Sequence, residues 1–315
     1  MRKYPEIKNK AGRIFLCIAF VCLAIQGCMK DSLAECGVSI RILYTLNPAH
    51  TDRLAEVGNF TVYIFDANGV FYDSRTVQGP FQDGRGYTVS FALHPGTYDF
   101  IVWGNLGDDY QLPAFVKGQT KEMDASLLLS NLQNSILRDS LADLYYGALL
   151  KQVVKPALQQ NQIYTVDMIK DTKDVMVIAK GLKEGEDPLN TDLFNCYITS
   201  RNTGLNFLNR IYGAQMTYET DSYVEEGNFI SEFTLLREMK DRSTESMLVV
   251  TMRVNGVERI LFQRSLIDLL LAQMASTGQD LDLVDRFTIE INFDNYATTS
   301  IRINGWESII IDEPL

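Results

Sequence analysis

The sequence has few residues of the kinds that metal sites and nucleophilic catalysis require. Its 315 residues include two histidines and five cysteines, whereas zinc sites need clustered ligands and a catalytic triad needs a histidine held by a carboxylate. Basic residues are also in deficit: 29 Lys and Arg oppose 40 Asp and Glu, for a formal net charge of −11, which disfavours electrostatic binding of nucleic acid. No phosphate-binding glycine pattern is present. An enzyme is therefore disfavoured, and no cofactor, metal or small-molecule substrate is expected.

The residues that do carry such chemistry are scattered. His50 and His94 both lie beside prolines and turn residues, so each is expected in an exposed loop. Asp280, Asp282 and Asp285 could meet a cation, but a solvated acidic loop is the simpler interpretation.

A long apolar run is also missing, since the longest one is too short to span a bilayer. Residues 14–25 (IFLCIAFVCLAI) are unbroken apolar residues, but a transmembrane helix needs about 20. Five basic residues and one acid precede this run. A basic segment before a short apolar stretch is typical of a secretory signal peptide, which we place at residues 1–27.

The end of this segment resembles a bacterial lipobox, in which signal peptidase cuts before a cysteine that then carries lipid. The box residues are Ile25, Gln26, Gly27 and Cys28. Cys28 is thus the predicted lipid-attachment site. Burial of its acyl chains in the bilayer would contribute about 0.8 kcal/mol per CH₂ to membrane binding. The mature chain of 288 residues would carry 24 basic and 39 acidic residues, a net charge of −15. Such a chain would be repelled by anionic surfaces, so a lipid rather than a basic patch should hold it to the outer membrane.

The remaining cysteines allow one intramolecular pair. Cys17 and Cys22 leave with the signal peptide, which leaves Cys36 and Cys196. In an oxidising compartment these two could form a disulfide. Because they fall in different predicted domains, two small buried or tail thiols are the simpler alternative.

The first part of the mature chain alternates apolar and polar residues in short segments, as β-strands do. Strands are predicted near 38–46, 60–65, 70–77, 87–93 and 97–103. The turn at 66–69 contains Asn-Gly, a strong hairpin signal. Residues 124–150 differ: their leucines recur at helical spacing, which predicts one or two short helices or loops laid over the sheet. Pro156 and the polar stretch 159–162 then indicate a domain junction.

The second half repeats this β pattern. Strands are predicted near 164–169, 175–179, 193–199, 229–236, 247–254, 287–293 and 300–304. Residues 265–275 are the one clear helix, with a capping-box-like start at Ser265 and Asp268 and a stop at Gly278. The predicted fold is therefore all-β, with two tandem β-sandwich domains and short helical insertions. Their bounds are a tether at 28–37, an N-terminal domain at 38–161 and a C-terminal domain at 162–315.

Several motifs, in this order, resemble the FimB-like family of fimbrial subunits from Bacteroides-type bacteria. They are CMKDSLAEC (28–36), VYIFDANGVF (62–71), PGTYDFIVWGNL (95–106), DLYYG (143–147), VDMIKDTKDVMVIAKGL (166–182) and INGW (303–306). The resemblance implies two transthyretin-like β-sandwich domains. It also implies a lipid-anchored outer-membrane subunit that holds a fimbrial shaft and limits its length by contact with the shaft subunit. The resemblance further implies that shaft subunits of the same superfamily join by donor-strand exchange, in which an extended strand of one subunit fills a groove in its neighbour.

The chain ends favour an anchor over a shaft subunit. Only nine residues follow Trp306, which leaves little to donate as a strand. Arg53 lies where shaft subunits can carry a cleavage site, although an ordinary loop arginine is the favoured interpretation.

The alternative function is a fimbrial tip or adhesin subunit, or a glycan-binding surface lipoprotein. A glycan-binding face could be lined by aromatic residues, although core positions are the commoner role for such residues on strands. The candidates are Tyr63, Phe65, Trp103, Tyr145, Tyr146 and Trp306.

Overall fold

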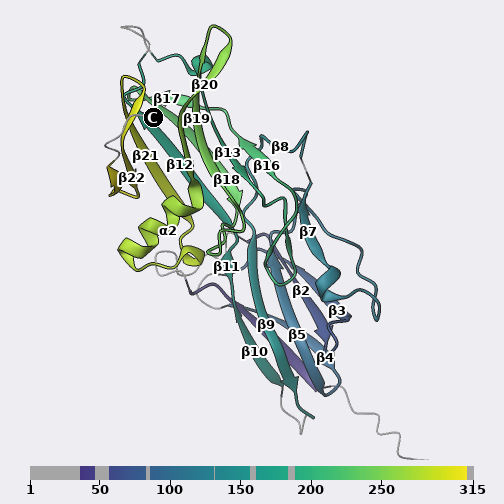
Figure 1. Cartoon of the computed structure of the whole chain (residues 1–315). Coiled ribbons are helices and arrows are strands. Elements are labelled where there is room, and N and C mark those ends of the chain that lie inside the picture. The colour runs from purple at the N-terminus through teal and green to yellow at the C-terminus, as the bar shows by residue number, and fades with distance from the viewer. Residues whose placement is uncertain are drawn as a thin grey trace, which may run out of the picture.

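The computed structural model describes residues 36–46, 57–82, 86–130, 132–156, 161–183 and 189–310, of which 306–310 are described as backbone only. The signal peptide, Cys28 and its box, His50 and Arg53 lie outside these residues. The described chain is almost entirely β, as the sequence predicts (Figure 1).

The N-terminal half is a sandwich of two sheets. The first has the order β10-β1-β4 and is built from β10 (Gln162–Asp167), β1 (Cys36–Leu43) and β4 (Tyr87–Leu93). The second has the order β11-β9-β5-β2-β3 and comprises β11 (Ile169–Lys170), β9 (Tyr145–Val154), β5 (Gly96–Gly104), β2 (Asn59–Asp66) and β3 (Phe71–Gln78). Apolar residues from both sheets form one core between them.

The central strand β2 is buried on both faces, which explains why its sequence, NFTVYIFD, is apolar without alternation. Phe60, Val62 and Ile64 point into the core shared with the first sheet. Tyr63 and Phe65 belong to a second core on the opposite face. The predicted turn after β2 is present: Asp66 Oδ1 accepts hydrogen bonds from the backbone N–H groups of Asn68 and Val70.

The second core exists because a further small sheet covers this face. Its order is β15-β14-β7-β6, built from β15 (Ile211–Tyr212), β14 (Gly204–Asn206), β7 (Ser126–Leu129) and β6 (Tyr110–Gln111). The prediction of helices within 124–150 is therefore wrong. The helical element there is a 3₁₀ turn, η2 (Glu122–Asp124), followed by strands β7, β8 (Ile136–Leu137) and β9. Leu127 and Leu129 alternate with outward residues as a strand requires, and long-range pairing with β14 overrides the local helical spacing.

The C-terminal half is a second sandwich. One sheet has the order β17-β18-β12-β21-β22-β23, and the other β20-β19-β13-β16-β8. The strands are β12 (Thr172–Lys180), β13 (Phe194–Ser200), β16 (Met216–Glu219), β17 (Tyr223–Glu225), β18 (Asn228–Leu236), β19 (Met247–Val254), β20 (Val257–Ser265), β21 (Arg286–Asp294), β22 (Ala297–Ile303) and β23 (Trp306–Ile310). Two 3₁₀ turns, η3 (Thr191–Leu193) and η4 (Leu281–Leu283), complete it.

The predicted helix in this half is confirmed as α2 (Leu266–Thr277). The Ser265 side chain caps it by accepting a hydrogen bond from the backbone N–H of Asp268, and Gly278 ends it in the left-handed conformation.

The two halves exchange segments. β10, which the sequence assigned to the C-terminal domain, pairs in parallel with β1 of the N-terminal sandwich. β14 leaves the C-terminal half to pair with β7 over the N-terminal half, and β15 pairs with the other edge of β14. β8 crosses in the other direction to pair with β16. One core of buried residues therefore runs through both halves.

Candidate functional site

The structure places Cys36 in β1 and Cys196 in β13, where both are buried but not joined by a disulfide. They belong to the two different cores, so the candidate pair is not brought together. Burial raises the pKa of the Cys196 thiol to about 12. Such a thiol is a small apolar core group rather than a nucleophile.

The aromatic candidates for a glycan-binding face are mostly core residues. Tyr63, Phe65, Trp103 and Tyr145 are all buried, which confirms the structural interpretation for these four. Tyr146 is half-buried and donates a hydrogen bond from its hydroxyl to the carbonyl of Phe207.

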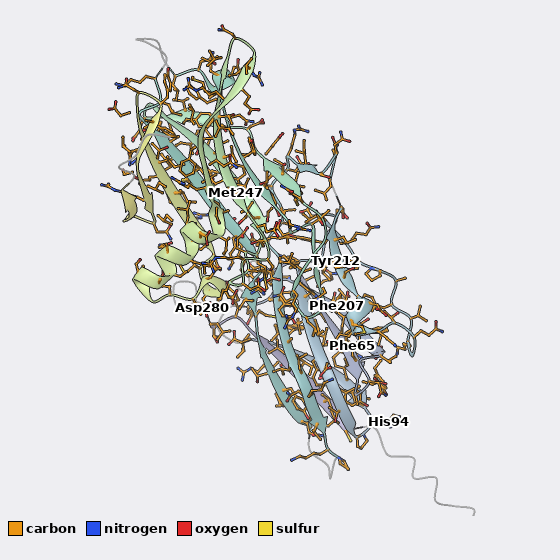
Figure 2. The ribbon with its side chains drawn as sticks, viewed as in Figure 1. Phe65, His94, Phe207, Tyr212, Met247 and Asp280 are labelled. Atoms are coloured by element: carbon orange, nitrogen blue, oxygen red, sulfur yellow. The ribbon has the colours of Figure 1, made fainter. Side chains whose placement is uncertain are left out.

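The candidate cation ligands are matched by basic side chains. Asp280 and Asp282 both contact Lys240, at 2.5 and 2.9 Å, and Asp282 also contacts Arg237 at 2.5 Å. Asp285 accepts a hydrogen bond from the Tyr44 hydroxyl at 3.0 Å. Among the described residues, no group of three or more histidine, cysteine, aspartate or glutamate side chains could hold a metal ion. His94 lies exposed in the turn between β4 and β5 (Figure 2).

An ionic cluster instead occupies the junction of the two halves. Lys170, at the end of β11, is buried and contacts Asp143 at 2.8 Å and Asp174 at 3.0 Å. Lys173, in β12, is buried more deeply and donates from Nζ to the carbonyls of Lys170 and Asp282. Burial lowers the pKa of Lys173 to about 8.

Asp171 lies between these two lysines and is fully buried. It accepts a hydrogen bond from Asn209 Nδ2 at 2.9 Å, and Arg237 lies 3.5 Å away. Burial raises the pKa of Asp171, while Arg237 and Asn209 act in the opposite direction. Because removing one partner from a buried pair leaves an uncompensated charge, the cluster should tolerate substitution poorly. The sequence showed these charges as a run between two strands but gave no sign of their burial.

An open surface pocket of about 480 Å³ lies beside this cluster. Its wall combines half-buried Tyr146 and exposed Leu208 with the side chains of Arg210, Arg237 and Asp241. Arg237 contacts Asp171 and Asp282. Hydrogen bonds from Ser243, and to a lesser extent the charge of Arg210, lower the pKa of Asp241.

Open sheet edges are a further feature that could bind another chain. In the described chain, β20 and β17 each pair with one neighbour only, at the ends of their sheets. An open edge presents unpaired N–H and C=O groups, which another extended chain can satisfy. Residues 253–260 of the β19–β20 hairpin are all exposed. The described residues thus include open strand edges to which another extended chain could add.

The fold defines an all-β protein of packed sheets whose outer strands leave open edges. Residues 31–312 match the model of the fimbrillin-A associated anchor proteins Mfa1 and Mfa2. The chain belongs to this family.

Individual relatives agree with this assignment. The chain is 24% identical over 235 residues to the major fimbrium anchoring subunit FimB of Porphyromonas gingivalis, covering 71% of this chain and 75% of that protein. It is 24% identical over 279 residues to the minor fimbrium anchoring subunit Mfa2 of the same species, covering 82% and 80%. The solved structure of the fimbrial anchor protein Mfa2 superimposes with a TM-score of 0.73 at 20% identity, covering 88% of this chain and 100% of that one. No helix among the described residues is long and apolar enough to cross a membrane.

Proposed function

We propose that this protein is a lipid-anchored subunit of the outer membrane that holds a fimbrial shaft at the cell surface and limits its length. The observation that carries the proposal is the family match over residues 31–312, together with relatives named as anchoring subunits. Its role is structural: it acts through β-strand contacts with the shaft subunit rather than by catalysis.

The signal peptide, lipid site, tether and two domains follow one another along the sequence. Residues 1–27 direct export and are removed, Cys28 receives lipid, and the tether proposed at 28–37 leads into β1, which begins at Cys36. The two domains proposed for 38–161 and 162–315 then stand outside the membrane. The short tether places the N-terminal half next to the lipid.

The test of anchoring is deletion of the protein in its own cells. Fimbriae should then be released into the medium or grow abnormally long, and fibres that stay attached at normal length would contradict the proposal. Cys28→Ala should abolish palmitate labelling and release the protein from the membrane. If the variant stays in the membrane and still takes palmitate, the lipid-attachment site is elsewhere.

The second candidate is a tip, adhesin or glycan-binding subunit, and the open pocket beside Tyr146 is the feature that favours it. Immunogold labelling separates the two. Label at the end of the fimbria nearest the cell supports the anchor, whereas label at the distal tip supports the second candidate.

A further inference from the structure

The hairpin of β19 and β20 ends in a tip, residues 253–260, that is exposed at every position. Three of its residues are apolar: Val254, Val257 and Ile260 are 42, 68 and 55% exposed. Val254 pairs with Val257 across a two-residue turn in which Asn255 and Gly256 both have positive φ. In Figure 1 the tip projects beyond the end of the C-terminal sandwich. The tip thus exposes aliphatic side chains on a two-stranded hairpin end whose residues are all exposed.

The backbone of β20 adds an open edge to these side chains. Within the described chain β20 pairs only with β19. Side chains alternate between the two faces of a strand, so Val257 and Ile260, three residues apart, point to opposite faces. A strand added along β20 would satisfy its free backbone groups and pack alternate side chains on both faces. Natural proteins usually shield such an edge with charges, prolines or a covering element, and here the exposed Glu258 and Arg259 lie between the two apolar residues.

The lipid-attachment site indicates which way this tip points. β1 begins at Cys36, eight residues after Cys28, and an extended chain spans at most about 3.6 Å per residue. Cys36 pairs with Leu93, next to His94, which lies at the end of the molecule opposite the hairpin (Figures 1 and 2). A lipid on Cys28 would therefore hold the His94 end within roughly 30 Å of the membrane, with the tip facing away from it.

We propose that the tip of the β19–β20 hairpin is the surface to which the first shaft subunit binds, through an extended apolar segment that adds as a strand to β20. This inference rests on the proposed function, because the partner is the fimbria that the protein anchors. The membrane lies at the other end of the molecule, so the exposed aliphatic groups at the tip serve a protein partner.

Site-specific cross-linking tests the contact directly. A photo-reactive amino acid replaces Val257 in the full-length protein, expressed in cells that lack the native copy, and the cells are irradiated while fimbriated. The matched control replaces Ile163 of β10, which is 65% exposed and lies in the N-terminal half. Val257 should give an adduct that mass spectrometry identifies as the shaft subunit, and Ile163 should not. A product containing two copies of this chain, or equal shaft adducts from both positions, would overturn the proposal.

A charge substitution tests the consequence. The double variant Val257→Asp, Ile260→Asp should raise the fraction of fimbriae shed into the medium at least tenfold, the change that a loss of about 1.4 kcal/mol in binding produces. The control Ile163→Asp should shed at the wild-type level. Both variants change exposed residues, so each should melt within a few degrees of wild type, which shows that shedding does not reflect unfolding.

Deletion of the whole protein separates the two proposals. If deletion sheds fimbriae but the double variant retains them, the protein anchors the shaft through another surface and the tip proposal is wrong. If deletion itself leaves fimbriae attached, the proposed function fails.

Discussion

Replacing Phe207 by alanine should weaken the association of the two halves more than any surface change. Phe207 follows β14, belongs to the C-terminal half by sequence, and is fully buried over the N-terminal half beside Phe65 (Figure 2). Its ring lies 5.0 Å from that of Tyr63, 5.9 Å from Phe65 and 6.1 Å from Trp103. Truncation of a buried phenylalanine costs about 3–5 kcal/mol. Since the ring is packed against a sheet that is itself buried on both faces, little collapse into the cavity is expected.

The expected loss for Phe207→Ala is therefore about 4 kcal/mol, equivalent to a fall of roughly 10 °C in melting temperature for a chain of this size. The assay is thermal unfolding followed by circular dichroism, with Leu208→Ala as the control. Leu208 is the next residue but is 41% exposed, so its truncation should cost less than about 1 kcal/mol. Equal, small effects for the two variants would refute the view that this segment ties the halves together.

Three further changes test other parts of the structure. Burial raises the pKa of Glu238 to about 7, above its value in the unfolded chain. The free energy of unfolding should therefore fall as pH rises from about 4.5 to 7, by up to roughly 3 kcal/mol. Urea titrations at several pH values should show a smaller pH dependence in Glu238→Gln. Gly181→Ala should destabilise the protein strongly, because at φ +80° the new Cβ would lie 2.2 Å from the carbonyl oxygen of Phe293. The control Gly118→Ala, also at positive φ but in open space, should cost only about 1 kcal/mol. Equal denaturation midpoints for the two variants would contradict this. Cys196 should resist maleimide in the folded protein and react after denaturation without a reductant, so a requirement for reductant would reveal a disulfide.

The strands were predictable where one local pattern determines them. The hairpin at 66–69 and the helix capped by Ser265 followed from turn and capping residues, which act within four positions of each other. Residues 124–150 failed because their leucines suit a helix or a strand, and only pairing with β14, some 75 residues away, decides between them. The ionic junction was invisible for the same reason: the charge of Asp171 is local information, but its burial depends on Asn209 and Arg237.

The pairing of β1 has a consequence for mechanical load. If flow pulls on a fimbria held by the hairpin tip while a lipid on Cys28 holds the N-terminus, tension enters the fold through β1 along its own axis. β1 lies between β10 and β4 and is hydrogen-bonded to both, and these bonds run across the strand. Force along the strand therefore shears both ladders at once instead of opening them one bond at a time. A central strand attached to the lipid would let the protein resist a sustained pull without unravelling from its N-terminus.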